Sequence, residues 1–339
     1  MLLSLGFTKK STPVCTEPIP RVAASTTALD AIWRSLISQS VGLNTSKQYA
    51  SGQKLYIAFC ASLEASPCPA TELLLLRFVA AQSSRVSGYT IQSYLSAIRF
   101  LHITNGFDNP ITSYDRLRLV IRALKKAAGP KRQRAPITIA ILLQIHKQMN
   151  CSLYNDILFW AMTCIGFFGF LRVSEFTTDG EFDEKFDLSF SDLAFSRDLK
   201  SLSINLKSSK TDPFRQGVQI IIGRTDGVLC PIQAMLRYIA ARSSHSGALF
   251  KFKNGRSASR SWFSKRLKQV VAKSGFQGDF TSHSLRIGAA SEASKAGFPD
   301  SLVQVLGRWA SDSFKLYIRI PRDTLTNSAR CICRGSLTA

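Results

Sequence analysis

Acidic side chains are scarce in this sequence, and that shortage is the strongest feature of its composition. The 339 residues hold 22 Asp and Glu against 44 Lys and Arg, which gives a formal net charge of +22. Such an excess repels itself, so it predicts a polyanionic partner, with nucleic acid first and an anionic membrane surface a distant second. The apolar fraction of 45% excludes a mainly disordered chain, and the length favours two domains.

Metal-ligand patterns are also missing. The eight cysteines are scattered without a Cys-x-x-Cys pair, and the sequence has only four His. We therefore expect no metal site, and a reducing compartment in which the thiols stay free.

No apolar run is long enough to predict a membrane span. The longest, residues 157–171, has about 15 residues and ends at Arg172, whereas a spanning helix needs about 20. This run therefore predicts a buried helix. The first apolar residues precede Lys9 and Lys10, the reverse of the order in a signal peptide, so we do not expect export.

The first part of the chain is predicted to be helical. Residues 1–26, rich in Pro, Ser and Thr without a period, predict a flexible arm. Residues 27–126 show helical periodicity and no strand-like alternation, which predicts a small helical bundle. Its expected helices cover 29–37, from a cap at Asn44 or Thr45 to Phe59, 73–79, from Ser87 or Thr90 to Leu101, and 114–127.

Basic and amide side chains near these helix ends are able to reach a DNA groove, although each also suits an ordinary solvated face. Residues 116–134 contain eight Lys or Arg and no acid, and helix breakers at 129, 130 and 136 predict a basic linker over 127–137. Such a linker can lie along a phosphate backbone; the alternatives are a plain solvated linker or a nuclear-import signal. The candidates for DNA contact are Lys47, Arg85, Gln92, Arg99, Lys125, Lys126, Lys131, Arg132 and Arg134.

Residues 138–339 predict a second domain in which the helical period changes to two and then returns. Strands are expected over 188–195, 202–206 and 218–222, and helices over 142–149, 156–176, 231–242, 259–275, 283–297, 300–306 and a short helix with Tyr317 on its second turn. The predicted fold is mainly α, a helical amino-terminal domain followed by an α+β domain with a small three-stranded antiparallel sheet.

Two pairs of polar residues have helical spacing. Arg172 and Glu175 lie three positions apart at the end of the predicted 156–176 helix, and His283 and Arg286 have the same spacing in a later helix. Each pair also occurs as an ordinary surface ion pair or solvated face. Together, two guanidinium groups are able to clamp a phosphate by bidentate hydrogen bonds, without a metal ion.

Other side chains supply what phosphoryl transfer still requires, a nucleophile and a proton for the leaving oxygen. Tyr317, with an ordinary pKa near ~10, is the nucleophile, and His283 accepts its proton or bonds a phosphate oxygen. Lys210, on a hairpin tip, protonates the leaving 5′ oxygen; Lys207 competes for that role. Trp309 offers one indole N–H and a large apolar body as a wall.

These residues resemble the sequence boxes of the tyrosine recombinases, the phage-integrase-like family of site-specific recombinases. The motifs are Gly169-Phe-Leu-Arg172-Val-Ser-Glu175, Ser209-Lys210-Thr211, Ser282-His283-Ser-Leu-Arg286, and Gly307-Arg-Trp309 through Tyr317. They cover residues 138–320, and the preceding helical domain resembles the family's core-binding domain. Trp309 takes the place of the second His of the family motif, and Gly-Arg-Trp precedes the nucleophile. In these two features the motifs are similar to those of recombinases from the DIRS-like and Crypton-like mobile elements of eukaryotes. The step from Trp309 to Tyr317 is eight residues, one shorter than is common in bacterial and phage members.

The resemblance implies a site-specific DNA recombinase or integrase that works through a 3′-phosphotyrosyl intermediate. It implies catalytic roles for Arg172, Glu175, Lys210, His283, Arg286, Trp309 and Tyr317. It also implies a tetramer on double-stranded DNA, no cofactor, and location in the nucleus of a eukaryote or otherwise in the cytoplasmic nucleoid. The alternatives are a catalytically silent DNA-binding descendant of such an enzyme, and topoisomerase-like relaxation by the same tyrosine.

Overall fold

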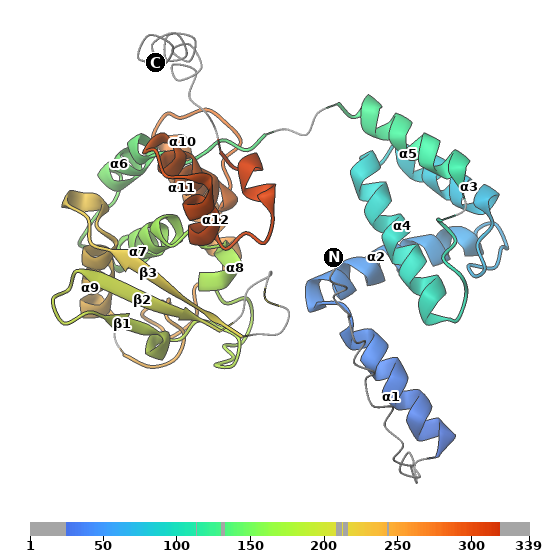
Figure 1. Cartoon of the computed structure of the whole chain (residues 1–339), viewed down its shortest axis with the longest axis horizontal. Helices are drawn as coiled ribbons and strands as arrows, with labels where there is room; N and C mark the ends of the chain where they lie inside the picture. Colours follow the sequence, from blue (N-terminus) through green and yellow to red (C-terminus); the bar gives the residue numbers. More distant parts are fainter. Residues whose placement is uncertain are drawn as a thin grey trace, which may run out of the picture. The chain divides into compact units, whose positions relative to one another are not determined.

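The chain divides into two compact units, residues 1–131 and 132–339. The computed structural model describes residues 25–112, 114–129, 133–207, 212, 216–242 and 244–318 (Figure 1). Most of the predicted flexible arm, residues 1–24, and residues 130–132 of the predicted linker lie outside this range. Both segments therefore remain predictions.

The first unit contains five helices within the described residues. They are α1 (Thr26–Gln39), α2 (Leu43–Ala61), α3 (Glu72–Ser83), α4 (Gly88–Thr104) and α5 (Asp115–Ala127). Helices α2 to α5 share an apolar core that includes Tyr56, Phe78, Ile98 and Leu117, whereas α1 buries none of its residues. The four packed helices form the bundle that positions the basic side chains described below.

The predicted start of α2 is wrong. Gly42 precedes the helix in an extended conformation and accepts the first backbone hydrogen bond, from Ser46 N at 2.9 Å. The helix therefore begins at Leu43, and neither Asn44 nor Thr45 is its cap. At α4 the first of the two expected caps is correct, because the Ser87 hydroxyl accepts from Thr90 N.

The second unit is mainly helical, with one three-stranded antiparallel sheet among the described residues, which confirms the predicted fold class. The sheet has the order β1-β2-β3. The strands are β1 (Leu193–Phe195), β2 (Ser201–Leu206) and β3 (Val218–Gly223). The helices are α6 (Ile139–Lys147), α7 (Tyr154–Phe168), α8 (Val173–Phe176), α9 (Pro231–Ala241), α10 (Arg260–Lys273), α11 (His283–Lys295) and α12 (Asp300–Gly307), with 3-10 turns η1 (Phe190–Asp192), η2 (Gly227–Leu229) and η3 (Asp312–Leu316).

The first strand is shorter than predicted. Residues 190–192 form the 3-10 turn η1, which is closed at its start by a hydrogen bond from Ser189 N to Asp192 Oδ2 of 2.8 Å. This capping interaction competes with the sheet ladder, so β1 keeps only three residues. The pairing of β1 with β2 is antiparallel, with Leu193 opposite Ile204.

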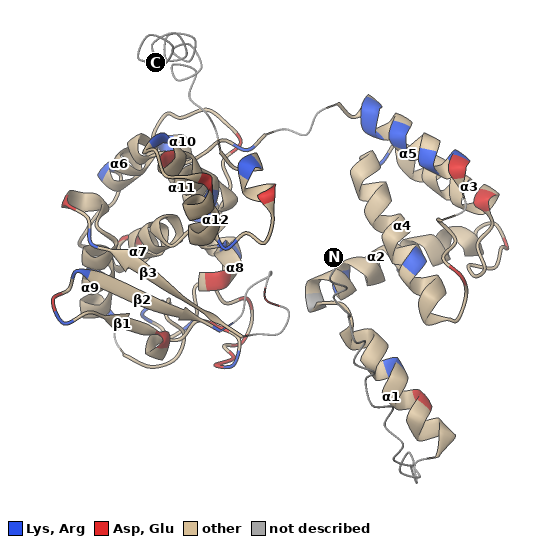
Figure 2. Ribbon diagram, in the orientation of Figure 1, with Lys and Arg blue, Asp and Glu red and all other residues tan. Residues whose placement is uncertain are grey.

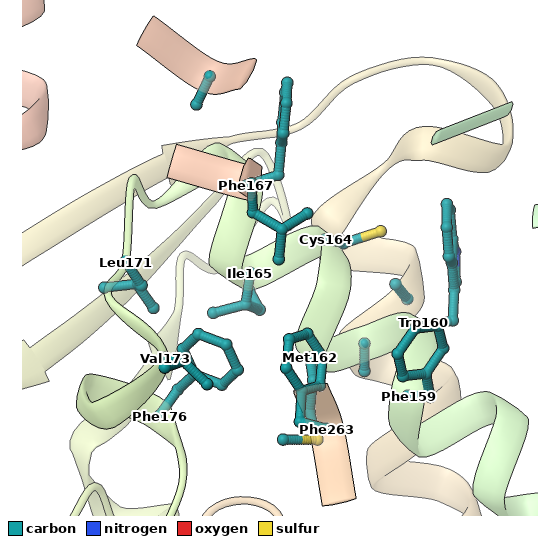
Figure 3. Close-up of a cluster of buried hydrophobic side chains, with 14 of the residues drawn as sticks. Phe159, Trp160, Met162, Cys164, Ile165, Phe167, Leu171, Val173, Phe176 and Phe263 are labelled. Atoms are coloured by element: carbon teal, nitrogen blue, oxygen red, sulfur yellow. The ribbon is translucent and has the colours of Figure 1, made fainter. Parts of the chain in front are cut away.

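The predicted single helix 156–176 is also wrong, because it is two helices. Helix α7 ends at Phe168, Gly169 follows as its C-cap, and Phe170 adopts a left-handed backbone with φ of 50°. A Cβ at position 169 would lie 2.8 Å from Ile165 O, so this turn needs glycine. Figure 3 shows side chains of α7 and α8 in one hydrophobic cluster. The ring of Phe176 lies 3.2 Å from the position that a Cβ on Gly166 would take.

Among the described residues, no helix has both the length and the apolar character needed to cross a membrane.

Candidate active site

The turn between α7 and α8 presents the first arginine. Arg172 is the N-cap residue of α8, and its backbone N–H donates to Glu175 Oε2 at 2.8 Å. Its guanidinium Nη1 donates to the other oxygen of the same carboxylate at 2.8 Å. Glu175 is buried, with 3% of its side chain exposed. The pair predicted from spacing is therefore an ion pair that fixes the guanidinium at the start of a helix, not at the end of α7.

The second arginine, Arg286, lies on α11 and is fully buried. Its guanidinium donates to Phe170 O at 2.5 Å and to Gly307 O, and it lies 4.4 Å from the centre of the Trp309 ring. Burial, followed by the charge of Arg172, lowers the pKa of Arg286 to about 9. The guanidinium thus remains charged at neutral pH and joins the α7–α8 turn to the end of α12.

The predicted nucleophile lies beside two of the other candidates. The ring centre of Tyr317 is 4.9 Å from that of His283 and 5.1 Å from that of Trp309. The expected helix around Tyr317 is wrong, because Ser311 caps the 3-10 turn η3, and Tyr317 is the residue that follows this turn. Ser291 on α11 donates its hydroxyl to Tyr317 O at 3.2 Å, so the end of the turn is held close to the helix that carries His283.

His283 is held in its neutral form. Burial lowers its pKa to about 4, and the charges of Arg134, Arg286 and Arg172 act in the same direction. Arg134 acts here because residues 135–137 run beside the start of α11, with hydrogen bonds from Ala135 N to Asp279 O and from Ile137 N to Ser284 O. The predicted linker cation Arg134 therefore lies in the second unit. A neutral imidazole beside Tyr317 is a proton acceptor.

The low pKa of His283 gives a prediction about pH. The unfolded chain protonates this imidazole near 6.5, whereas the folded chain does so only near 4. Stability is therefore lost as pH falls from about 6.5 toward 4, and this loss is absent above that window. We expect the urea midpoint of the wild type to fall more steeply across this window than that of His283→Gln. Parallel curves for the two proteins would contradict the buried, neutral imidazole.

Trp309 provides an apolar surface beside Tyr317 and Arg286. It is 7% exposed and packs against the rings of Phe170 and Phe314. Gly307 makes this packing possible, since a Cβ there would lie 1.5 Å from the Trp309 ring. Within the described part of the chain, the Trp309 indole N–H is buried without a hydrogen-bond partner. A buried donor of this kind is costly unless a ligand satisfies it.

Arg308 is not among the residues predicted for the site, although it lies within it. Its Nη2 donates to Glu175 Oε2 at 2.9 Å and to Phe170 O at 3.1 Å, and its Nη1 donates to Gly169 O at 3.1 Å. Arg172 and Arg308 therefore share the Glu175 carboxylate, and Arg286 and Arg308 share the Phe170 carbonyl of the α7–α8 turn. No local spacing in the sequence points to these contacts, because Gly169 and Glu175 lie more than 130 residues before Arg308.

Of the two candidate hairpin lysines, the structure describes only Lys207. Lys207 is engaged in a local network, with Nζ 2.8 Å from Asp192 Oδ2, 2.7 Å from Glu184 O and 3.1 Å from Ser189 Oγ. These contacts surround its ammonium group with protein acceptors, and the choice between the two lysines stays a prediction. Lys210, the preferred candidate, lies outside the described residues.

A basic groove lies on the first unit between α4 and α5. We define it by its polar lining: Tyr89, Gln92, Ser96, Arg99, Asn109, Thr112, Arg118, Arg122, Lys125 and Lys126. Figure 2 shows the basic residues spaced along α5. Lys125 donates to Gln92 Oε1 at 2.5 Å, which links the two helices.

The groove collects only some of the residues predicted to contact DNA. Gln92, Arg99, Lys125 and Lys126 line it, whereas Lys47 and Arg85 do not. Lys131 and Arg132 lie outside the described residues. Arg118 and Arg122 were not predicted and do line the groove, although Arg118 also forms an ion pair with Asp115.

Comparison with known proteins agrees with this architecture. Residues 183–319 match the Phage integrase family. Solved structures similar to this chain include the XerH site-specific recombinase bound to palindromic difH substrate in a post-cleavage complex, with 14% identity over 91% of this chain and 84% of that chain and a TM-score of 0.61. A lambda integrase dimer bound to a COC′ core site has 20% identity, coverage of 86% and 76%, and a TM-score of 0.59. The Tn1549 transposon integrase in complex with transposon right end DNA has 15% identity, coverage of 86% and 95%, and a TM-score of 0.56.

No curated protein matches the sequence. The family match covers residues 183–319, and the solved structures show that the chain has the fold of the tyrosine recombinases. The finer placement with DIRS-like or Crypton-like elements stays a prediction. No group of three or more His, Cys, Asp or Glu in the described ranges is placed to hold a metal ion.

Proposed function

We propose that this protein is a site-specific DNA recombinase or integrase that breaks and rejoins strands through a 3′-phosphotyrosyl intermediate at Tyr317. The observation that carries the proposal is the position of Tyr317, whose ring lies 4.9 Å from that of a neutral His283 and 5.1 Å from that of Trp309. A tyrosine beside a proton acceptor and several guanidinium groups is the arrangement that attack on a phosphodiester requires.

The chemical step follows from these groups. Tyr317 passes its phenolic proton to His283, and the phenolate oxygen attacks the scissile phosphorus. The new bond joins this oxygen to phosphorus, and the bond from phosphorus to the 5′ oxygen breaks. The electron pair stays on the 5′ oxygen, which takes a proton from Lys210. Guanidinium groups neutralise the charge that develops on the non-bridging oxygens.

The same chain is proposed to supply all of these groups to one phosphate, because Tyr317 lies beside its own His283. The phosphotyrosyl bond conserves the energy of the phosphodiester, so rejoining needs no nucleotide cofactor. A lambda integrase tetramer bound to a Holliday junction is among the similar structures, with 17% identity and a TM-score of 0.56. We extend that arrangement to this chain as four protomers on two duplexes, in the nucleus if the source is a eukaryotic mobile element.

The test is direct isolation of the intermediate. DNA fragments that copurify with the protein are rebuilt as nicked duplexes. The short cleaved product diffuses away from such a duplex, so the strand cannot be rejoined and the covalent adduct accumulates. After protease digestion, mass spectrometry should find the DNA on the peptide that contains Tyr317. If the protein binds the recovered DNA but no nicked duplex ever yields an adduct, the proposal fails. The protein is then a catalytically silent DNA-binding descendant of such an enzyme. Relaxation of any supercoiled plasmid without regard to sequence would instead indicate a topoisomerase.

The basic groove is the proposed DNA-contact surface of the first unit, and it yields a prediction. Lys126→Ala should weaken binding to all sequences about equally and reduce the salt dependence of binding by about one counterion, because a phosphate contact carries no base information. The matched control is Arg116→Ala on the same helix, since Arg116 does not line the groove and forms an ion pair with Glu72 at 2.5 Å. Equal salt slopes for wild type and Lys126→Ala would place the DNA elsewhere.

A further inference from the structure

Arg308 ends α12 in an unusual backbone conformation. It has φ of 56° and ψ of 45°, in the left-handed region that residues other than glycine rarely adopt. This conformation reverses the chain, so that Trp309 packs back on Gly307 and the chain continues through η3 to Tyr317. This backbone conformation is unfavourable in free energy for a residue other than glycine, so it persists only where contacts of the side chain stabilise it.

Those contacts all reach the turn that carries the first arginine or the end of α12. Arg308 donates to the carbonyls of Gly169, Phe170 and Leu306 and to the carboxylate of Glu175. Glu175 uses its other oxygen to hold Arg172. The carboxylate thus connects the guanidinium proposed to bind phosphate with the first residue of the segment that leads to Tyr317.

We propose that Arg308 is a positioning residue, which fixes the distance between Tyr317 and the phosphate-binding Arg172 by joining the 308–317 segment to the 169–175 turn. This inference rests on the proposed function. Its four hydrogen bonds use all four N–H groups of the two terminal nitrogens, and 11% of its side chain is exposed. Arg286 differs, because its bonds to Phe170 O and Gly307 O use only one N–H group on each terminal nitrogen. The Arg308 guanidinium therefore acts through Tyr317 and Arg172 and makes no contact of its own with the reacting phosphate.

Hydrogen exchange tests the positioning without any need for catalysis. In the wild type the amides of Trp309 and Tyr317 donate to Gln304 O and Phe314 O. In Arg308→Ala we expect these two amides to exchange at least about tenfold faster than in the wild type. Amides of α10 should not change. The matched control is Arg266→Ala, because Arg266 forms a comparable ion pair with Asp156 at 2.6 Å within the same unit. Unchanged exchange at Trp309 and Tyr317 in Arg308→Ala overturns the inference.

Cleavage of a charge-neutral substrate separates positioning from phosphate contact. On a nicked duplex, Arg308→Ala should cleave about 10²-fold more slowly, as a displaced nucleophile does, with DNA affinity nearly unchanged. A methylphosphonate at the scissile position removes one negative charge, so it should partly rescue Arg172→Ala and leave Arg308→Ala unrescued. Rescue of Arg308→Ala overturns the inference, because it would show direct phosphate contact. If the wild type itself forms no adduct, the proposed function fails while hydrogen exchange still decides the role of Arg308.

Discussion

Tyr317→Phe should form no covalent complex with DNA while it binds the same DNA with unchanged affinity. The substitution removes only the phenolic oxygen, which is the atom that would bond to phosphorus. The remaining ring keeps its contacts with His283 and Trp309, and the backbone keeps its hydrogen bond from Ser291. Denaturing gels of nicked-duplex reactions measure the covalent complex, and a mobility-shift titration measures affinity.

The control for this substitution is Tyr49→Phe in the first unit. Tyr49 packs against the ring of Phe100 and belongs to none of the motifs. It should form the covalent complex at the wild-type rate. An adduct formed by Tyr317→Phe would assign the nucleophile to a different residue and would remove the central role given to the end of η3.

The sequence was most informative where chemistry depends on short local spacing. His283 and Arg286 share the first turns of α11, where His283 lies beside Tyr317 as expected and Arg286 donates to Phe170 O. The break between α7 and α8 was not visible, because Phe170, Leu171 and Val173 are as apolar and as buried as the helix before them. A hydrophobic run reports burial, whereas the left-handed backbone at Phe170 depends on packing that periodicity does not encode.

Arg308 shows the same limit at longer range. Its partners Gly169 and Glu175 precede it by more than 130 residues, so no local pattern distinguishes it from a solvated arginine. Lys47 and Arg85 lie near helix ends but do not line the basic groove, because its lining depends on which faces of α4 and α5 the side chains occupy. Their contact with DNA stays a prediction.

Arg286→Lys should reduce cleavage by about 10³-fold, the upper end of what the loss of a fixed oxyanion donor costs. The charge is kept, but the planar fork is lost, and the fork is what allows one side chain to hold Phe170 O and Gly307 O at once. A lysine ammonium reaches one of these carbonyls and leaves the other without its buried donor, at a cost of about 1–3 kcal/mol. Thermal unfolding measures that cost separately from the cleavage rate.

Arg242→Lys supplies the control that separates lost catalysis from lost stability. Arg242 is also a buried arginine, 5% exposed, and it donates to the carbonyls of Leu249, Ser246 and Ala248. It lies beside an aromatic ring, that of Phe190, as Arg286 lies beside Trp309. The two substitutions should destabilise the domain by similar amounts, while only Arg286→Lys loses cleavage. Equal loss of cleavage in both would mean that Arg286 acts through folding alone, because Arg242 contacts none of the residues assigned to the phosphate.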